Sequence, residues 1–118
     1  MVYSDTYKPC WFALQVKCGM EQMTAGLLQS KGFEAFLPSH EQSQSAYGDS
    51  TGEPLFPGYL FCRFDPVRRT PVVMTPGVVR VLGFGTTPAP LSESEIEAVR
   101  DIVRLAGNAE RRKHTNAL

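Results

Sequence analysis

The sequence predicts an α+β domain in which helices pack on a mainly antiparallel, four-stranded sheet. Short apolar segments that suit strands alternate with segments whose apolar residues recur at helical spacing. The predicted elements follow the order β-α-β-loop-β-α-β-α, which is typical of this class. A chain of 118 residues is long enough for one domain that buries roughly two-thirds of the surface of its unfolded chain.

The first third of the chain is predicted to form a strand, a helix and a second strand. Residues 11–16 are a short apolar run that suits a central strand. Residues 20–31 carry apolar side chains at helical spacing, and Gly32 suits the position that follows the end of a helix. A second strand is predicted over 33–37, and it closes at Pro38.

The third predicted strand, over 54–64, carries large apolar groups on both faces. It follows a polar segment over 40–53, which is expected to form a mobile loop or a protruding hairpin. A strand with one face in water alternates apolar and polar side chains. Here one face consists of Leu60, Cys62 and Phe64, and the other of Tyr59, Phe61 and Arg63. Either a second layer covers each face, or one face binds a partner.

The last third is predicted to form a short helix, a strand and a longer helix. The strand is expected over 78–84. Ser92 and Glu95 have the spacing of a capping box, so the last helix is expected to begin there. Gly107 is expected to end that helix, and 108–118 is expected to be a linker or tail.

The helices over 20–31 and 92–106 are expected to cover one face of the sheet. They would pack on Leu60, Cys62 and Phe64 and make these residues the core. The opposite face would then form an open apolar patch. Its expected members are Trp11, Ala13, Tyr59, Phe61 and either Val79 or Val81.

Composition excludes several classes of function. Twelve basic residues balance twelve acidic ones, so no global field attracts nucleic acid. A nucleic-acid contact would need a local patch, for which the candidates are Lys17, Arg68, Arg69 and Arg80. Three cysteines and two histidines without a CxxC pair predict neither a metal site nor a disulfide framework. We expect no enzymatic activity, because no nucleophile–base arrangement stands out, and no cofactor or small-molecule substrate.

The chain is expected to be cytoplasmic and to make no contact with a membrane. Its start has neither the basic nor the apolar region of a signal peptide. No apolar run approaches the roughly 20 residues that span a bilayer.

The segment 54–61 reads Pro-Leu-Phe-Pro-Gly-Tyr-Leu-Phe and resembles the Phe-Pro-Gly-Tyr signature of the NusG family of transcription elongation and antitermination factors. The resemblance is to the amino-terminal (NGN) domain and covers residues 10 to 106, so that the domain is expected over 1–107. Segment 54–66 is similar to the specialised paralogue RfaH. Further matches are Trp11, Gly19 with Glu21, Pro38, 77–84 and 88–91.

The resemblance implies a non-enzymatic protein that binds RNA polymerase and suppresses pausing. Domains of this family accept the clamp helices of the largest subunit in an apolar concavity. They also approach the lobe of the second-largest subunit, and some members touch the non-template DNA strand. By position, the residues implied at the clamp-helix surface are Phe56, Pro57, Tyr59 and Phe61, with Trp11 on the neighbouring strand and Gln15 and Phe84 at the border.

Three departures from the family pattern stand in the sequence: a shortened segment, the lack of a following domain, and a balanced charge that gives no strong stripe for DNA. The region that corresponds to the lobe contact reads Val-Arg-Arg-Thr-Pro over 67–71 and is shorter than in RfaH. No carboxy-terminal KOW domain follows within the sequence, which ends at Leu118.

Two other classes of function compete with this interpretation. The first is a single-stranded nucleic-acid-binding module, in which exposed aromatic side chains of a similar sheet stack on bases. The neutral net charge and the absence of the RNA-binding motif of such sheets disfavour it. The second is a small enzyme of acylphosphatase-like fold, which needs a phosphate-binding loop that the sequence does not display.

Overall fold

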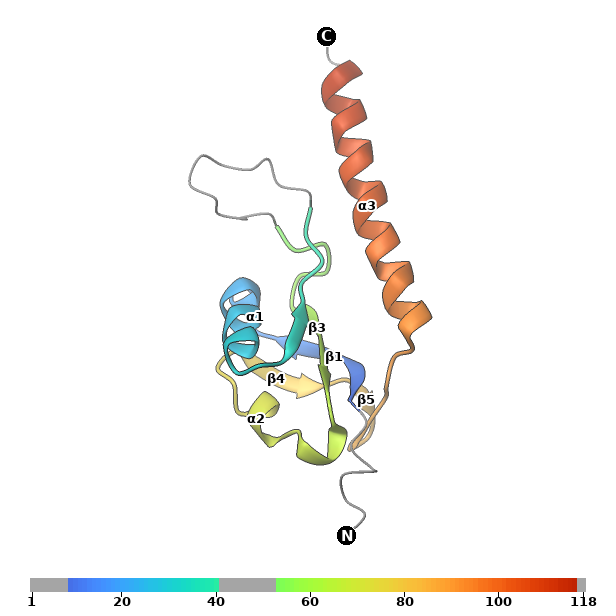
Figure 1. Cartoon of the computed structure of the whole chain (residues 1–118). Helices are drawn as coiled ribbons and strands as arrows, with labels where there is room; N and C mark the ends of the chain where they lie inside the picture. The colour runs from blue at the N-terminus through green and yellow to red at the C-terminus, as the bar shows by residue number, and fades with distance from the viewer. Residues whose placement is uncertain (1–8, 41–52, 117–118) are drawn as a thin grey trace.

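A computed structural model describes residues 9–40 and 53–116, and it confirms the α+β class (Figure 1). Four antiparallel strands form one sheet with the order β2-β3-β1-β4. The elements, in chain order, are β1 (Cys10–Val16), α1 (Glu21–Ser30), β2 (Glu34–Phe36), β3 (Tyr59–Phe64), the 3-10 turn η2 (Pro66–Arg68), α2 (Thr70–Val73), β4 (Val78–Val81), β5 (Gly83–Phe84), β6 (Thr87–Pro88) and α3 (Glu93–Asn116).

The core lies on one face of the sheet, between the strands and helices α1 and α2. The predicted core residues Leu60, Cys62 and Phe64 are almost completely buried there. Phe64 packs against Phe12 of β1, with ring centroids 4.7 Å apart. The cluster also contains Leu14 and Val16 from β1, Ala25 and Leu28 from α1, and Val72 from α2. Each large apolar side chain that is removed from water in this way contributes about 1.5–3 kcal/mol to stability.

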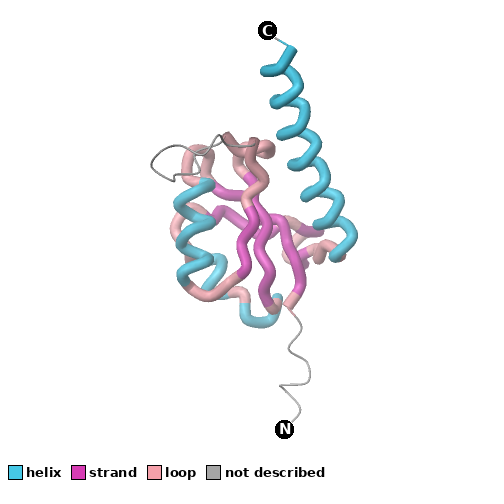
Figure 2. Tube along the Cα trace, turned by 45° about the horizontal axis from the view of Figure 1, so that its top comes forward, coloured by secondary structure: helices cyan, strands magenta, loops and turns pink. Residues whose placement is uncertain are grey.

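The expectation that the helices cover only one face is wrong, because α3 packs on the opposite face. Figure 2 shows α1 and α3 on opposite sides of the strands. Among the described side chains of α3, those that are buried or half-buried recur at positions i, i+3, i+4, i+7 and i+10: Ile96, Val99, Arg100, Val103 and Ala106. The connection explains the side, since Leu91 bridges to Trp11 and donates its N–H to the Trp11 carbonyl over 2.7 Å. This bridge leads the chain past β1 and onto the second face.

The strand predicted over 78–84 is divided into β4 and β5. A register shift in the β1–β4 ladder sets Val78 opposite Val16 and Arg80 opposite Gln15, which leaves Val79 as an extra, exposed residue. As a result Val81 packs against the core rather than on the second face. At Gly83 the chain turns into a hairpin with β6, where a Cβ would overlap the carbonyl oxygen of Thr87.

The third strand begins later than predicted, at Tyr59 rather than at residue 54. Before it, the chain runs beside the segment that follows β2: Leu55 donates to the Pro38 carbonyl over 2.8 Å, and Ser39 bridges to Pro54. Most of the polar segment over 40–53, for which we predict a loop or hairpin, lies outside the described residues.

The ends of the helices follow the predicted capping chemistry, with one exception. Gly32 has φ +93°, and the N–H of Phe33 reaches the Leu28 carbonyl, as in a Schellman motif. Ser92 and Glu95 form the predicted capping box through hydrogen bonds of 2.7 and 3.1 Å.

The exception is the end of α3, which continues past Gly107 to Asn116. A single glycine inside a helix costs only about 1 kcal/mol relative to alanine, and the residues that flank it favour helix. A helix of 24 residues is about 36 Å long, and its second half projects beyond the sheet (Figure 1). The division into a domain over 1–107 and a tail over 108–118 stays a prediction.

The packing of Phe64 predicts a large loss of stability on truncation. Phe64→Ala is expected to lower the free energy of unfolding by about 3–5 kcal/mol, because it loses transfer free energy and leaves a cavity beside Phe12. Chemical denaturation measures it. The matched control is Val67→Ala, whose side chain is 87% exposed and whose removal should change stability by no more than about 0.5 kcal/mol. Equal midpoints for the two variants would contradict this core.

The contact of Arg100 with the sheet predicts a spectroscopic change. The Arg100 guanidinium lies 5.8 Å from the ring centroid of Trp11, the only tryptophan of the chain. Arg100→Ala is expected to expose the indole, to shift its fluorescence to longer wavelength and to cost about 0.5–2 kcal/mol. Arg104→Ala, one turn further along α3, removes an exposed arginine and should leave the emission unchanged. An emission that does not respond to Arg100→Ala would mean that α3 does not cover Trp11.

Candidate protein-binding surface

The Phe-Pro-Gly-Tyr segment forms a tight turn that leads into β3. The N–H of Tyr59 donates to the Phe56 carbonyl over 3.0 Å, and Gly58 has φ +86°. A hydrogen bond from the fourth residue to the first, with proline second and glycine third, is the pattern of a type II turn. Proline supplies the fixed φ that the second position needs, and glycine tolerates the positive φ of the third. The signature therefore encodes a backbone conformation that sets Phe56 and Tyr59 at the two ends of one turn.

Beyond this turn, the face of the sheet that points away from α1 carries two rows of side chains. The first row crosses β2, β3 and β1 through the register pairs Phe36–Phe61 and Phe61–Ala13. The second crosses β3, β1 and β4 through the pairs Tyr59–Gln15 and Gln15–Arg80. We call the four aromatic residues of this region, Phe36, Phe56, Tyr59 and Phe61, the aromatic face.

The aromatic face is partly open to solvent. Phe56 and Tyr59 are each 36% exposed, so both present part of an aromatic ring to solvent. Phe61 is half-buried and stacks on Phe36, with ring centroids 6.1 Å apart and planes inclined by 28°. Phe36 and Phe61 stabilise each other by stacking. Phe56 and Tyr59, at the turn, offer aromatic contact area, and binding would restrict few of their rotamers.

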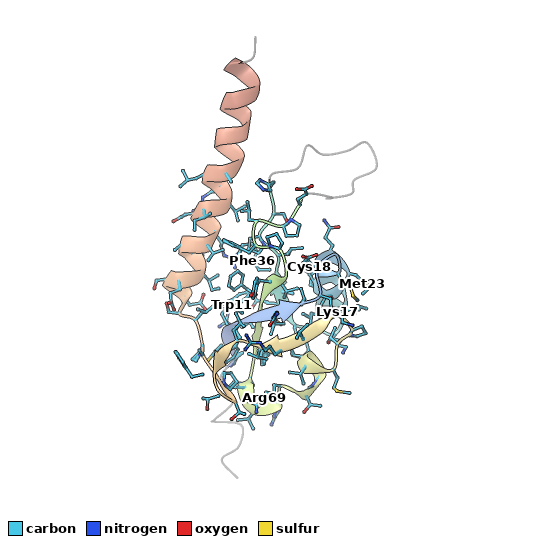
Figure 3. All side chains as sticks on the ribbon, turned by 180° about the vertical axis from the view of Figure 1, so that it is seen from behind. Trp11, Lys17, Cys18, Met23, Phe36 and Arg69 are labelled. Carbon is cyan, nitrogen blue, oxygen red and sulfur yellow. The ribbon has the colours of Figure 1, made fainter. Side chains whose placement is uncertain are left out.

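Trp11, which we predict at the same surface, is only 3% exposed. Arg100 of α3 lies over both Trp11 and Phe36, at 5.8 and 4.7 Å from the ring centroids. Figure 3 shows Trp11 and Phe36 on the side of the sheet that α3 covers. In this arrangement Trp11 supports the aromatic face from beneath α3 and is not itself available to a partner.

The two predicted border residues lie in different surroundings. Gln15 is half-buried, and its Oε1 accepts a hydrogen bond of 2.8 Å from Nε of Arg80. Phe84 is 82% exposed on the β5–β6 hairpin, where few other side chains pack against it. The register joins Gln15 to Tyr59, whereas Phe84 is carried by a separate small sheet.

The four candidate nucleic-acid contacts do not form one patch. Lys17 follows β1 and Arg80 lies on β4, both near the end of the sheet at which β3 begins. Arg68 and Arg69 follow the other end of β3, and Figure 3 shows Arg69 apart from Lys17. A cavity of about 290 Å³ lies on that side of the molecule, lined by Phe33, Asp65, Arg68 and Pro71.

The described residues display little reactive chemistry. Burial raises the pKa of the Cys62 thiol to about 12, which keeps it protonated and unreactive. None of the three cysteines, Cys10, Cys18 and Cys62, which all lie in the described part of the chain, forms a disulfide. Among residues 9–40 and 53–116, no three His, Cys, Asp or Glu side chains gather where they could hold a metal ion. Nor does any helix in that part of the chain have the length and apolar character that crossing a bilayer requires.

Sequence reasoning missed the contacts of three residues that shape this region. The place of Phe36 was detectable, since it shares a strand face with Glu34 and lies near the end of the predicted strand that Pro38 closes. Arg100 lies four residues after Ile96, on the inward stripe of α3, but a charged residue on such a stripe gives no signal of an aromatic partner. Glu21 is found in the sequence only as a match to the family, and nothing there indicates its contact: its carboxylate accepts a hydrogen bond from Gly58, 37 positions away, which no local pattern predicts.

Comparisons with known proteins identify the family of this chain. A family model described as "Transcription termination factor nusG" matches residues 9–100, which include all four strands of the sheet and the first turns of α3. A similar protein is the "Transcription termination/antitermination protein NusG" of Thermus thermophilus. It is 30% identical over 119 aligned residues, which cover 85% of this chain. The chain spans 65% of the length of that relative. From the match over most of its length, the chain belongs to the NusG family.

Proposed function

We propose that this chain is a transcription elongation and antitermination factor domain that binds the clamp helices of RNA polymerase through its aromatic face and suppresses pausing. The observation that carries the proposal is the exposure of Phe56 and Tyr59 on a fixed turn beside the stacked rings of Phe36 and Phe61. Membership of the NusG family supports a partner in the transcription machinery.

The physical character of the aromatic face suits a pair of helices as partner. A helical partner presents rows of apolar side chains that insert between rigid aromatic groups, as in other helix-in-groove complexes. Phe56 and Tyr59 are already ordered by the turn, so binding would immobilise little that is free. The half-buried Phe61 would contribute by supporting them rather than as an independent anchor.

Suppression of pausing requires a second contact, and the fold offers a place for one. Arg68 and Arg69 lie beyond the end of β3 that is remote from Tyr59. The five residue steps of β3 separate Tyr59 from Phe64 by about 17 Å. Two contacts at opposite ends of one rigid sheet would let the domain bridge two parts of the polymerase, with the clamp helices at one end and the lobe of the second-largest subunit at the other.

The alternative of a single-stranded nucleic-acid-binding module is less well supported. Such modules combine exposed aromatic platforms with a continuous basic groove. Here Arg80 is hydrogen-bonded to Gln15, and the remaining candidate cations are divided between two ends of the sheet. Lys17 and Arg80 stay candidates for a contact with non-template DNA that is secondary to the protein partner. A filter-binding assay with single-stranded RNA tests the alternative directly.

The first prediction of this proposal concerns binding. Phe56→Ala combined with Tyr59→Ala is expected to weaken binding to a clamp-helix peptide at least 100-fold, because exposed aromatic anchors carry a large share of binding energy. Circular dichroism should show an intact fold, since neither side chain belongs to the core. Met74→Ala is the matched control, as it removes an exposed apolar side chain from the end of α2, on the other side of the sheet. Unchanged binding by the double variant would rule out the aromatic face as the contact.

The second prediction concerns elongation. In a single-round transcription assay, the purified chain is expected to shorten the half-lives of polymerase pauses. Arg68→Ala combined with Arg69→Ala should preserve clamp-helix binding but reduce this effect, because it weakens only the second contact. The Phe56/Tyr59 double variant should lose both. If the chain binds polymerase without shortening any pause, bridging is the wrong mechanism and simple occupancy of the clamp helices is the better account.

A further inference from the structure

Glu21 is a buried carboxylate that joins two segments of the chain. It is the first residue of α1 and is only 4% exposed. Its Oε1 accepts a hydrogen bond of 2.8 Å from the N–H of Gly19, in the turn before the helix. Its Oε2 accepts a second bond, also of 2.8 Å, from the N–H of Gly58, in the turn that leads into β3. One side chain thus ties the start of α1 to the turn that carries Phe56 and Tyr59.

We propose that Glu21 is a positioning residue for partner binding: its carboxylate holds the Pro57–Gly58 turn against the N-terminus of α1 and thereby fixes the presentation of Phe56 and Tyr59. The inference rests on the proposed binding function of the aromatic face. It adds a residue that is too buried to touch a partner and that acts only through the turn.

The geometry of the turn explains why an external acceptor is needed. The turn's own hydrogen bond joins Tyr59 to Phe56 and leaves both polar groups of Gly58 free for other partners. The Gly58 carbonyl accepts from the N–H of Val16 over 2.8 Å, and the Gly58 N–H donates to Glu21. Gly58 is therefore anchored to β1 on one side and to α1 on the other. Without Glu21, a buried N–H would lose its acceptor and one of the two anchors would be gone.

The site also favours the charged form of the carboxylate. Burial, which raises the pKa of Glu21, is opposed by the backbone hydrogen bonds from Gly58, from Glu21 itself and from Gly19, and the balance lowers the pKa from its ordinary value of 4.5. The N-terminus of α1 favours a negative charge at the same place. Hydrogen bonds to an ionised acceptor are about twice as strong as those between neutral groups.

Glutamine is the informative substitution because it keeps the size of the side chain. Its amide has one oxygen, so it can accept from Gly19 or from Gly58 but not from both, and its NH₂ group would face the other N–H. The matched control is Glu95→Gln. Glu95 also lies in the first turn of a helix and accepts a backbone N–H, that of Ser92, and glutamine serves equally well in such a capping box.

The test measures the affinity of the whole chain for a clamp-helix peptide together with its melting temperature. Glu21→Gln is expected to weaken binding about tenfold under conditions in which the variant is folded, because ordering the turn then opposes association. Glu95→Gln should bind as the unsubstituted chain does. The loss of affinity caused by Glu21→Gln should be smaller when Phe56→Ala is also present, because part of the turn's contact is then already lost. It should be undiminished when Phe84→Ala is present. If Glu21→Gln acted only by unfolding part of the protein, affinity would fall by the same factor in both backgrounds.

Nuclear magnetic resonance gives a readout that needs no partner. Glu21→Gln should move the amide proton resonance of Gly58 and speed its exchange with solvent, while the amides of β1 and β4 stay protected. If Glu21→Gln does not fold, Glu21→Asp takes its place, since it keeps the charge beside Gly19 but is one methylene shorter and is expected to lose Gly58.

The outcomes separate the inference from the proposed function. If the unsubstituted chain fails to bind the peptide, the proposed function is wrong, and the Gly58 amide still decides whether Glu21 holds the turn. If the chain binds and a folded Glu21→Gln variant binds equally well, the proposed function stands and the positioning role is overturned. The positioning role is also overturned if the resonance and the exchange rate of the Gly58 amide are the same in the variant as in the unsubstituted chain.

Discussion

The antiparallel pairing of β1 with β3 determines which residues form each face of the sheet. Its register runs from Cys10 opposite Phe64 to Gln15 opposite Tyr59. Because successive side chains point to opposite faces, this register assembles the core from one set of residues and the aromatic face from the other. A slip by one residue would exchange the two sets and would place Arg63 among the core residues. The helices and the outer strands pack on surfaces that this pair has already defined.

Helix α3 covers one part of the second face of the sheet and leaves another part exposed. Near Trp11 and Phe36, α3 covers it, with Arg100 lying over both rings. Toward Tyr59 the cover ends, and the exposed rings of Phe56 and Tyr59 remain. The division has a physical basis: a strand with apolar groups on both faces needs two layers, and here α3 supplies part of the second layer. The part that α3 leaves open is where we place the clamp helices of RNA polymerase.

The turn before β3 links the core of the fold to the proposed binding surface. A proline and a glycine set its backbone, and the buried carboxylate of Glu21 fixes its place against α1. We propose that the presentation of Phe56 and Tyr59 depends on the hydrogen bond of 2.8 Å that the Gly58 N–H donates to the Glu21 carboxylate. A rigid turn suits an anchor, because affinity then does not have to offset the ordering of a loop.

The sequence alone predicts the class of the fold, the core parity of Leu60, Cys62 and Phe64, and the caps at Gly32 and Ser92. These features are encoded by local periodicity or by residues whose own backbone preferences allow few conformations. The three-dimensional structure is needed to see which face α3 covers, that the bulge at Val79 lets Val81 reach the core, and that α3 continues past Gly107. It also shows that Trp11 lies beneath Arg100 and that Glu21 binds Gly58. Each of these depends on contacts between residues far apart in the chain, and an amphipathic helix or a buried carboxylate carries no local mark of the partner it will meet.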